Sequence, residues 1–191
     1  MNARDIILAA VARTQPPLHP LPEEAALPNV EHDKVSTFIT LLEGIGGQVL
    51  RVKSYAEIET YIRSTFPEGQ RIITTCSKLP GFYGKSEQAG RPHDLFDVEL
   101  AVLESDLAVA ENGAVWIRDP FERAAPFICQ HLAVILHPDA IVADMHQAYD
   151  QIGAGDFDFG VFIAGPSKTA DIEQSLVLGA HGPKTMTVFL L

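Results

Sequence analysis

Short β-prone segments alternate with helical patterns over most of this chain, and that alternation is the feature that most constrains its fold. Runs rich in Val, Ile, Leu and Thr predict strands at 48–52, 71–75, 98–103, 107–110, 114–117, 131–136, 160–164 and 185–191. Apolar residues at helical spacing predict helices at 2–14, 35–42, 141–152 and 169–178. A further helix is predicted after a capping box formed by Ser54 and Glu57.

A tight turn interrupts this alternation. Glu111-Asn112-Gly113 lies between the apolar runs 107–110 and 114–117, and Asn-Gly in that position is a strong hairpin signal. Strands separated by helices of ~10–15 residues are typical of a parallel sheet. We therefore predict an α/β fold, in which a mostly parallel sheet is flanked by helices and carries an antiparallel hairpin insertion.

The first 30 residues differ from the rest of the chain. Residues 15–22, Gln-Pro-Pro-Leu-His-Pro-Leu-Pro, are rich in proline, which has no amide proton and cannot join the interior of a helix or sheet. We predict an N-terminal helix and proline-rich arm in residues 1–30, and a single α/β domain in residues 31–191. The arm could lie along the domain or along a partner subunit, as in a homodimer.

Charge and hydropathy exclude two kinds of partner. The net formal charge of −11 opposes binding to a phosphate backbone, so we expect no nucleic acid. No apolar run approaches the ~18 residues that a membrane-spanning helix needs. The N-terminus also lacks a basic region followed by an apolar stretch, so we expect no membrane span, no secretory signal and a cytoplasmic location.

Cysteine and histidine usage gives no support for a metal or other cofactor. An iron–sulfur cluster normally takes four thiolates, whereas this chain has two cysteines, Cys76 and Cys129, far apart in apolar surroundings. The histidines show no HExxH or comparable ligand spacing. We expect neither a metal nor a cofactor bound by this chain alone.

The segment 164–173 is the first candidate for a ligand site. A strand that ends at Gly165-Pro166 would lead into a helix capped by Ser167 or Thr169, and free amides at a helix N-terminus favour a carboxylate or phosphate. A simple cap without a ligand explains the same pattern, since Asp171 and Glu173 would already stabilise that helix end. The turn that follows holds His181 and Gly182, and His181 could be an acid, a base or a structural residue.

Two further segments could contribute to a site. Turn geometry explains Asn112 and Gly113 but not Glu111, and a rigidly held carboxylate suits a nucleophile or general base. The long loop 77–92 is basic, and could close over an anionic ligand or simply lie in solvent. Its cations, with two more after the hairpin, are Lys78, Lys85, Arg91, Arg118 and Arg123.

The C-terminal third closely resembles the signature of the LUD-domain family, also called LutC/YkgG. The resemblance rests on the runs 165–173, Leu176-Val177-Leu178-Gly179 and His181-Gly182-Pro183, and on the closing strand. Upstream, Ala110-Glu111-Asn112-Gly113 resembles the family's Ala-Glu-Thr-Gly turn, with Asn112 where the family usually has threonine. The resemblance covers roughly residues 95–191.

This resemblance implies a NagB/RpiA/CoA-transferase-like fold and a role in lactate utilisation. Proteins of the family work beside an iron–sulfur subunit and a cysteine-rich subunit that together oxidise L-lactate to pyruvate, so the implied role is non-redox. We predict a site for a small anionic ligand, with Glu111 as its candidate catalytic group. The predicted ligand-binding residues are Asn112, Gly113, Gly165, Ser167, Lys168, Thr169, Asp171, Glu173, His181 and Gly182.

Two alternative functions stay open, and with them the question of whether the chain is an enzyme. Glu111-Asn112-Gly113 is similar to the Glu-Asn-Gly of CoA-transferases, which implies an acyl-CoA-dependent transferase or hydrolase with Glu111 as nucleophile. A sensor of a small carboxylate or sugar phosphate would need the same ligand site but no chemistry.

Overall fold

The computed structural model describes residues 2–20, 33–82, 91–120, 122–169 and 177–191. The chain forms two compact units, Met1–Val30 and Glu31–Leu191. In the first unit, the helix α1 (Ala3–Arg13) begins at Asn2, whose side chain accepts a hydrogen bond from the amide of Asp5. Its apolar side chains Ile6, Ile7, Leu8 and Val11 are exposed.

A five-stranded parallel sheet forms the centre of the second unit, with the strand order β1-β11-β6-β3-β2. Its strands are β1 (Gln48–Arg51), β2 (Arg71–Thr74), β3 (Val98–Ser105), β6 (His131–Leu136) and β11 (Thr185–Leu190). The three central strands are mostly apolar and buried, which is what a sheet covered on both faces requires. The predicted α/β class with a mostly parallel sheet is confirmed.

A second sheet of four strands has the order β7-β4-β5-β8. It comprises β4 (Ala108–Val109), β5 (Ala114–Arg118), β7 (Ile141–Val142) and β8 (Gly160–Ile163). The predicted hairpin is the antiparallel pair β4 and β5, and β8 extends it on the far side of β5. Ser105 lies where the chain passes from one sheet to the other, and its hydroxyl is 2.8 Å from the carbonyl oxygen of Leu107 and 2.7 Å from that of Trp116.

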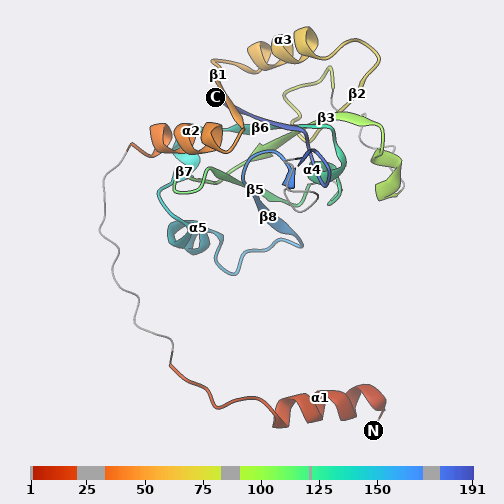
Figure 1. Ribbon diagram of the computed structural model, residues 1–191, viewed down its shortest axis with the longest axis vertical. Coiled ribbons are helices and arrows are strands. Elements are labelled where there is room, and N and C mark those ends of the chain that lie inside the picture. Colours follow the sequence, from red (N-terminus) through yellow and green to blue (C-terminus); the bar gives the residue numbers. More distant parts are fainter. Residues whose placement is uncertain (1, 21–32, 83–90, 121, 170–176) are drawn as a thin grey trace. The chain divides into compact units, whose positions relative to one another are not determined.

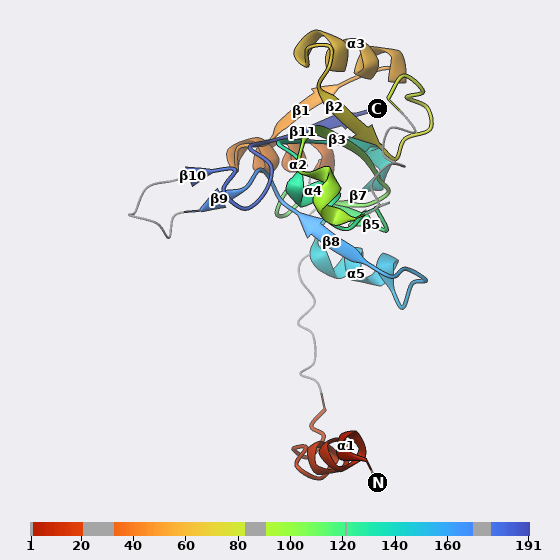
Figure 2. The same cartoon turned by 90° about the vertical axis from the view of Figure 1, so that its right-hand side faces the viewer.

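The second unit is layered, as Figures 1 and 2 show. The helix α3 (Tyr55–Thr65) covers the outer face of the five-stranded sheet through Ile58 and Ile62. The inner face packs against the four-stranded sheet and α2 (Lys34–Gly44) in the largest apolar core. The helix α5 (Met145–Ile152) covers the other face of the four-stranded sheet, over a smaller core around Trp116.

Side-chain caps begin the helices α2 and α3, and the cap at Ser54 is the one that the sequence predicted. Asp33 begins α2, and its carboxylate accepts hydrogen bonds from the amides of Val35 and Ser36. Ser54 begins α3 and accepts from the amide of Glu57 at 3.3 Å. The Glu57 carboxylate in turn accepts from the amide of Lys53, one residue earlier than in an ideal capping box.

Two predicted helices are wrong in whole or in part. Of the predicted helix 141–152, residues 141–142 are the strand β7, which pairs with β4, and α5 starts only after Asp144. The predicted helix 169–178 is replaced at both ends by an antiparallel pair, β9 (Lys168–Thr169) and β10 (Val177–Leu178). Ser167 therefore caps no helix, because Lys168 and Thr169 continue as a strand, and residues 170–176 lie outside the described residues.

Three short elements complete the described part of the chain: α4 (Ala125–Ile128) and two 3₁₀ turns at Pro92–Leu95 and Pro138–Ala140. Lys85 and half of the predicted 77–92 loop, residues 83–90, lie outside the described residues. None of the helices in the described ranges combines the length and the apolar character needed to cross a bilayer.

Both cysteine thiols are buried, and their reactivity is predicted to be low. Burial raises the pKa of Cys76 to about 11 and that of Cys129 to about 12, from 9.0. Because the thiolate is the reactive form, we expect both thiols to react slowly with a chromogenic disulfide reagent at neutral pH and rapidly after unfolding in denaturant. Rapid reaction of either thiol in the folded protein would contradict this burial.

The same pKa shifts predict lower stability in alkali. Because the folded state favours the neutral thiols, their contribution to stability is complete below pH 9.0 and is lost as the pH rises towards the folded-state pKa values of about 11 and 12. Urea unfolding followed between neutral pH and this range should therefore show a falling free energy of unfolding. The double variant Cys76→Ala and Cys129→Ala should lose part of that pH dependence.

Candidate functional site

The structure brings two of the predicted segments together at one end of the four-stranded sheet. At this end the register of β5 and β8 stops at the pair Val115 and Ile163, two residues after Gly113 and two residues before Gly165. Both glycines have positive φ angles and lie against the C-terminal end of α2. A Cβ at Gly113 would be 2.8 Å from the amide nitrogen of Leu42, and one at Gly165 would be 3.1 Å from Cγ1 of Ile45.

Glu111 is exposed and bound to the N-terminus of α5. Its Oε1 accepts a hydrogen bond of 2.9 Å from the amide of Met145, while its own amide donates to the carbonyl oxygen of Ala143 at 3.0 Å. Asp144 caps the same helix by accepting from the amide of Gln147 at 2.9 Å. Two carboxylates thus already occupy this positive helix end, which leaves it poorly suited to another anion.

The other two residues of the turn also have local structural roles. The Oδ1 of Asn112 accepts a hydrogen bond of 3.0 Å from the amide of Ala114. Gly113 has a φ of 67° and approaches the backbone of α2 too closely for a side chain. Each residue of Glu-Asn-Gly therefore has a structural role: Glu111 binds α5, Asn112 stabilises the turn, and Gly113 packs against α2.

We expect Glu111→Gln to have a small effect, since the amide oxygen can still accept the Met145 hydrogen bond. The loss of a negative charge at the helix N-terminus should lower the free energy of unfolding by about 0.3–1 kcal/mol in urea unfolding. Glu68→Gln, an exposed glutamate in a turn, is the matched control and should lose less. Equal losses in the two variants would show that α5 gains nothing from the Glu111 charge.

The segment that holds Ser167 is tied to the 179–183 turn. The amide of Ser167 donates to the carbonyl oxygen of Pro183 at 2.9 Å, and its carbonyl oxygen accepts from the amide of Gly179 at 3.0 Å. Its hydroxyl accepts from the amide of His181 at 3.4 Å. Gly182 packs on this serine, since a Cβ there would be 3.2 Å from the Ser167 Cβ.

Lys168 and Thr169 continue from this segment into β9. A Cβ built at Gly46 would lie 2.9 Å from Nζ of Lys168, so the ammonium group lies beside the turn between α2 and β1. Thr169 pairs with Val177 of β10. Two of the other predicted ligand-binding residues, Asp171 and Glu173, lie outside the described residues.

Three of the cations expected to form a basic patch, Lys78, Arg118 and Arg123, each have a partner in the structure. Lys78 donates to the hydroxyl of Tyr55 at 3.3 Å, and this hydrogen bond raises the pKa of the lysine. Arg118 pairs with Asp106 at 2.8 Å, and the guanidinium of Arg123 lies 5.3 Å from the centre of the Phe159 ring. Each side chain therefore contacts a different group.

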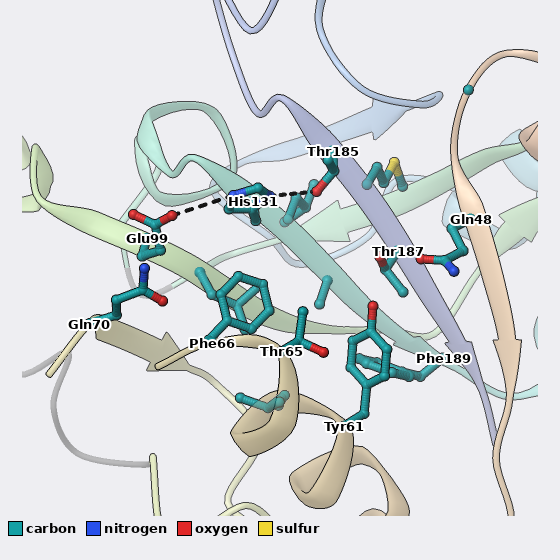
Figure 3. A pocket seen from close by; sticks show the side chains of 16 residues that line it. Gln48, Tyr61, Thr65, Phe66, Gln70, Glu99, His131, Thr185, Thr187 and Phe189 are labelled. Atoms are coloured by element: carbon teal, nitrogen blue, oxygen red, sulfur yellow. Dashed lines mark hydrogen bonds and ion pairs between the residues drawn. The ribbon is translucent and has the colours of Figure 1, made fainter. Parts of the chain in front are cut away.

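A pocket of about 370 Å³ lies elsewhere, between α3 and the outer face of the five-stranded sheet at the amino ends of its strands. Figure 3 shows a chain of three polar side chains from neighbouring strands along its edge. Nδ1 of His131 is 2.7 Å from Oγ1 of Thr185, and Nε2 of His131 is 3.4 Å from Oε1 of Glu99. The ring of Phe66, at the end of α3, packs edge-on against the imidazole with the ring centres 5.4 Å apart.

Sequence reasoning did not identify this pocket, although a signal for it exists. Glu99, His131 and Thr185 each stand in the first two positions of a strand whose remaining residues are mostly apolar. In parallel strands those positions fall at the same edge of the sheet, and here they lie side by side on β3, β6 and β11. Polar residues at corresponding starts of buried strands would have indicated a shared site.

Comparison with known proteins agrees with the resemblance seen in the sequence. A family model described as the LUD domain matches residues 84–191, more than half of the chain. A protein named Lactate utilization protein C from Shouchella clausii is 35% identical over 92 residues, which are 44% of this chain and 40% of that protein. The protein of the same name from Geobacillus kaustophilus is 38% identical over 92 residues, 44% of this chain and 38% of that protein.

The fold also matches a solved structure. The crystal structure of a DUF162 family protein from Deinococcus radiodurans superimposes with a TM-score of 0.63 and 16% identity, and the match covers 83% of this chain and 96% of that one. Identity this low shows the fold alone. This chain spans about two fifths of the length of the curated relatives it matches. The extent of the family-model match shows that this chain belongs to the LUD domain family.

Proposed function

We propose that this protein acts in lactate utilisation as a non-redox subunit of the LutC/YkgG type, beside iron–sulfur partner proteins that oxidise L-lactate to pyruvate. The observation that carries this proposal is the LUD domain match over residues 84–191, together with several relatives named Lactate utilization protein C. The non-redox assignment is supported by cysteine usage. The chain's two cysteines are both buried, whereas an iron–sulfur cluster takes four thiolates.

The proposed ligand of this subunit is a small anion that binds near Lys168. The support for it is three polar groups carried by this segment and its neighbouring turn: the Lys168 ammonium beside Gly46, the Ser167 hydroxyl, and His181, whose amide donates to that hydroxyl. A carboxylate or phosphate here would depend on the lysine charge. The contributions of Asp171 and Glu173 remain part of the same proposal.

A genetic and biochemical experiment tests the role in lactate oxidation. Deleting the gene should abolish growth on L-lactate while leaving growth on pyruvate intact, and the intact gene should restore it. A tagged full-length chain should co-purify with cysteine-rich iron–sulfur proteins and oxidise no lactate alone. Unimpaired growth on L-lactate after deletion would contradict the proposal, as would purification without any such partner.

A binding experiment tests the anion site separately. Lactate, pyruvate or inorganic phosphate should raise the midpoint temperature of thermal unfolding of the purified chain, and Lys168→Gln should reduce that increase. Lys34→Gln, which removes an exposed lysine from the start of α2, is the matched control and should leave the shift unchanged. An equal shift in both variants would show that Lys168 is not part of the site. Acylation of Glu111 by an acyl-CoA would support transfer chemistry instead.

A further inference from the structure

The pocket beneath α3 has the size and construction of a site for a small organic molecule. Its volume of about 370 Å³ falls within the range of ~300–1,000 Å³ that is usual for ligand pockets. One wall is formed by Tyr61, Thr65 and Phe66 at the C-terminal end of α3, and the floor is formed by the sheet (Figure 3). Two of the three wall residues are aromatic, a composition that favours a flat ring.

The floor of the pocket is polar where helix packing alone would need it to be apolar. Further along the strands, Phe189 and Leu50 pack under α3, and the Tyr61 ring meets Phe189 edge-on with the ring centres 5.4 Å apart. Nearer the amino ends, the register places Gln48 beside Thr187. The same outer face therefore changes from apolar to hydrogen-bonding side chains where the helix cover ends.

Hydrogen-bond acceptors are in excess around this floor. The Oε1 of Gln70 is buried and accepts no hydrogen bond from any residue that the structure describes. The Glu99 carboxylate, at the same edge of the pocket, is partly exposed, and its one contact among the described residues is the long 3.4 Å approach to His131. A buried acceptor without a donor is costly, so a ligand N–H group directed at Gln70 would restore a missing hydrogen bond, while one directed at Glu99 would replace water.

The charge of the pocket excludes the ligand class proposed for the Lys168 site. Among the described residues that line it there is neither lysine nor arginine, and Glu99 carries its one formal charge when His131 is neutral. A carboxylate or phosphate would therefore be repelled.

The pocket also lies at the amino ends of the parallel strands, whereas the ligands of open α/β sheets usually bind at the carboxyl ends.

We infer that this pocket binds an uncharged heteroaromatic molecule about the size of a nucleobase, with N–H donors directed at Gln70 and Glu99 and its ring against Tyr61 and Phe66. This site is separate from the anion site near Lys168, and it does not depend on the proposed role in lactate oxidation.

Adenine and nicotinamide, two uncharged rings that carry an NH₂ group, are suitable probes for the full-length chain. We expect saturable binding of at least one of them by isothermal titration calorimetry, with saturation transfer from the protein to the ring protons in NMR. Lactate and inorganic phosphate should not compete. Absence of binding by both probes, or competition by either anion, would overturn the inference.

Gln70→Leu distinguishes a binding role from a structural one. Because Oε1 accepts no hydrogen bond from the described residues, its removal should not lower the free energy of unfolding, whereas probe affinity should fall about tenfold or more. Gln151→Leu, which changes an exposed glutamine on α5, is the matched control and should bind the probe like the unchanged chain. Unchanged affinity in Gln70→Leu would rule out the assigned hydrogen bond.

Discussion

Replacing Gly113 by alanine is expected to lower the free energy of unfolding by about 2–5 kcal/mol, from two additive causes. The φ of 67° at Gly113 is left-handed, and an L side chain there costs ~1–2 kcal/mol. The new methyl group would also lie 2.8 Å from the amide nitrogen and 3.0 Å from the Cα of Leu42. Because both are backbone atoms of α2, the helix itself would have to shift, and such overpacking costs ~1–3 kcal/mol.

Gly69→Ala separates these two causes. Gly69 also has a positive φ, of 94°, but a Cβ there would meet nothing within 4 Å, so only the backbone cost of ~1–2 kcal/mol applies. Urea unfolding of both variants, followed by circular dichroism, measures the difference. Equal losses of unfolding free energy in the two variants would show that the added methyl group at Gly113 does not clash with α2. A larger loss of unfolding free energy for Gly113→Ala would show that close packing of the Glu111–Gly113 turn against α2 contributes to stability.

Phe38→Ala should have an effect at least as large, about 3–5 kcal/mol, because it empties the space of a whole ring in the main core. Phe38 is fully buried on α2, one helical turn before Leu42, where the core of the two sheets meets the helix. A loss of this size is comparable to the ~5–15 kcal/mol that stabilises a typical domain. We therefore expect the variant to be partly unfolded or to unfold at low urea concentration.

Phe96→Ala is the control for Phe38→Ala. The Phe96 side chain is 77% exposed, so its removal should change the free energy of unfolding by no more than ~0.5 kcal/mol. Differential scanning calorimetry can measure both variants. If the two lost similar stability, α2 would not be an essential part of the core between the sheets.

Most elements could be predicted because local chemistry and tertiary structure agree. The apolar residues of 98–103 and 131–136 are those of buried parallel strands, and the structure places both in the middle of the sheet. Ser54 begins α3 as predicted, and α2 ends at Gly44, just before Gly46 and Gly47. At these positions the residue type is explained by a local need, such as a helix cap or a buried strand, and a local need can be recognised from sequence alone.

The segment after Ser167 was misassigned because its partners are distant or too short to recognise. Ser167 and Thr169 resemble helix caps, but the backbone of Ser167 bonds to Gly179 and Pro183 instead. Strands of two residues, such as β9 and β10, cannot show an alternating pattern. The start of the predicted helix 141–152 failed for a similar reason, since two apolar residues pair with β4.

The candidate sites differ in how far sequence could predict them. Glu111, Gly113 and Gly165 were singled out in two motifs, and the register of β5 and β8 explains why these motifs meet. The pocket beneath α3 takes its residues from four strands and a helix, so no single stretch of sequence carries its pattern. Its unpartnered acceptor, Gln70, is visible only once the sheet and helix are assembled.

The position of β11 in the sheet determines when this fold can be completed during synthesis. β1, at residues 48–51, has β11, at residues 185–190, as its strand neighbour. A growing chain therefore presents β1 as an open edge, exposed to aggregation, until those late residues emerge from the ribosome. Pairing across such a sequence separation is slow, so we expect the pairing of β1 with β11 to be a late step in the folding of the sheet.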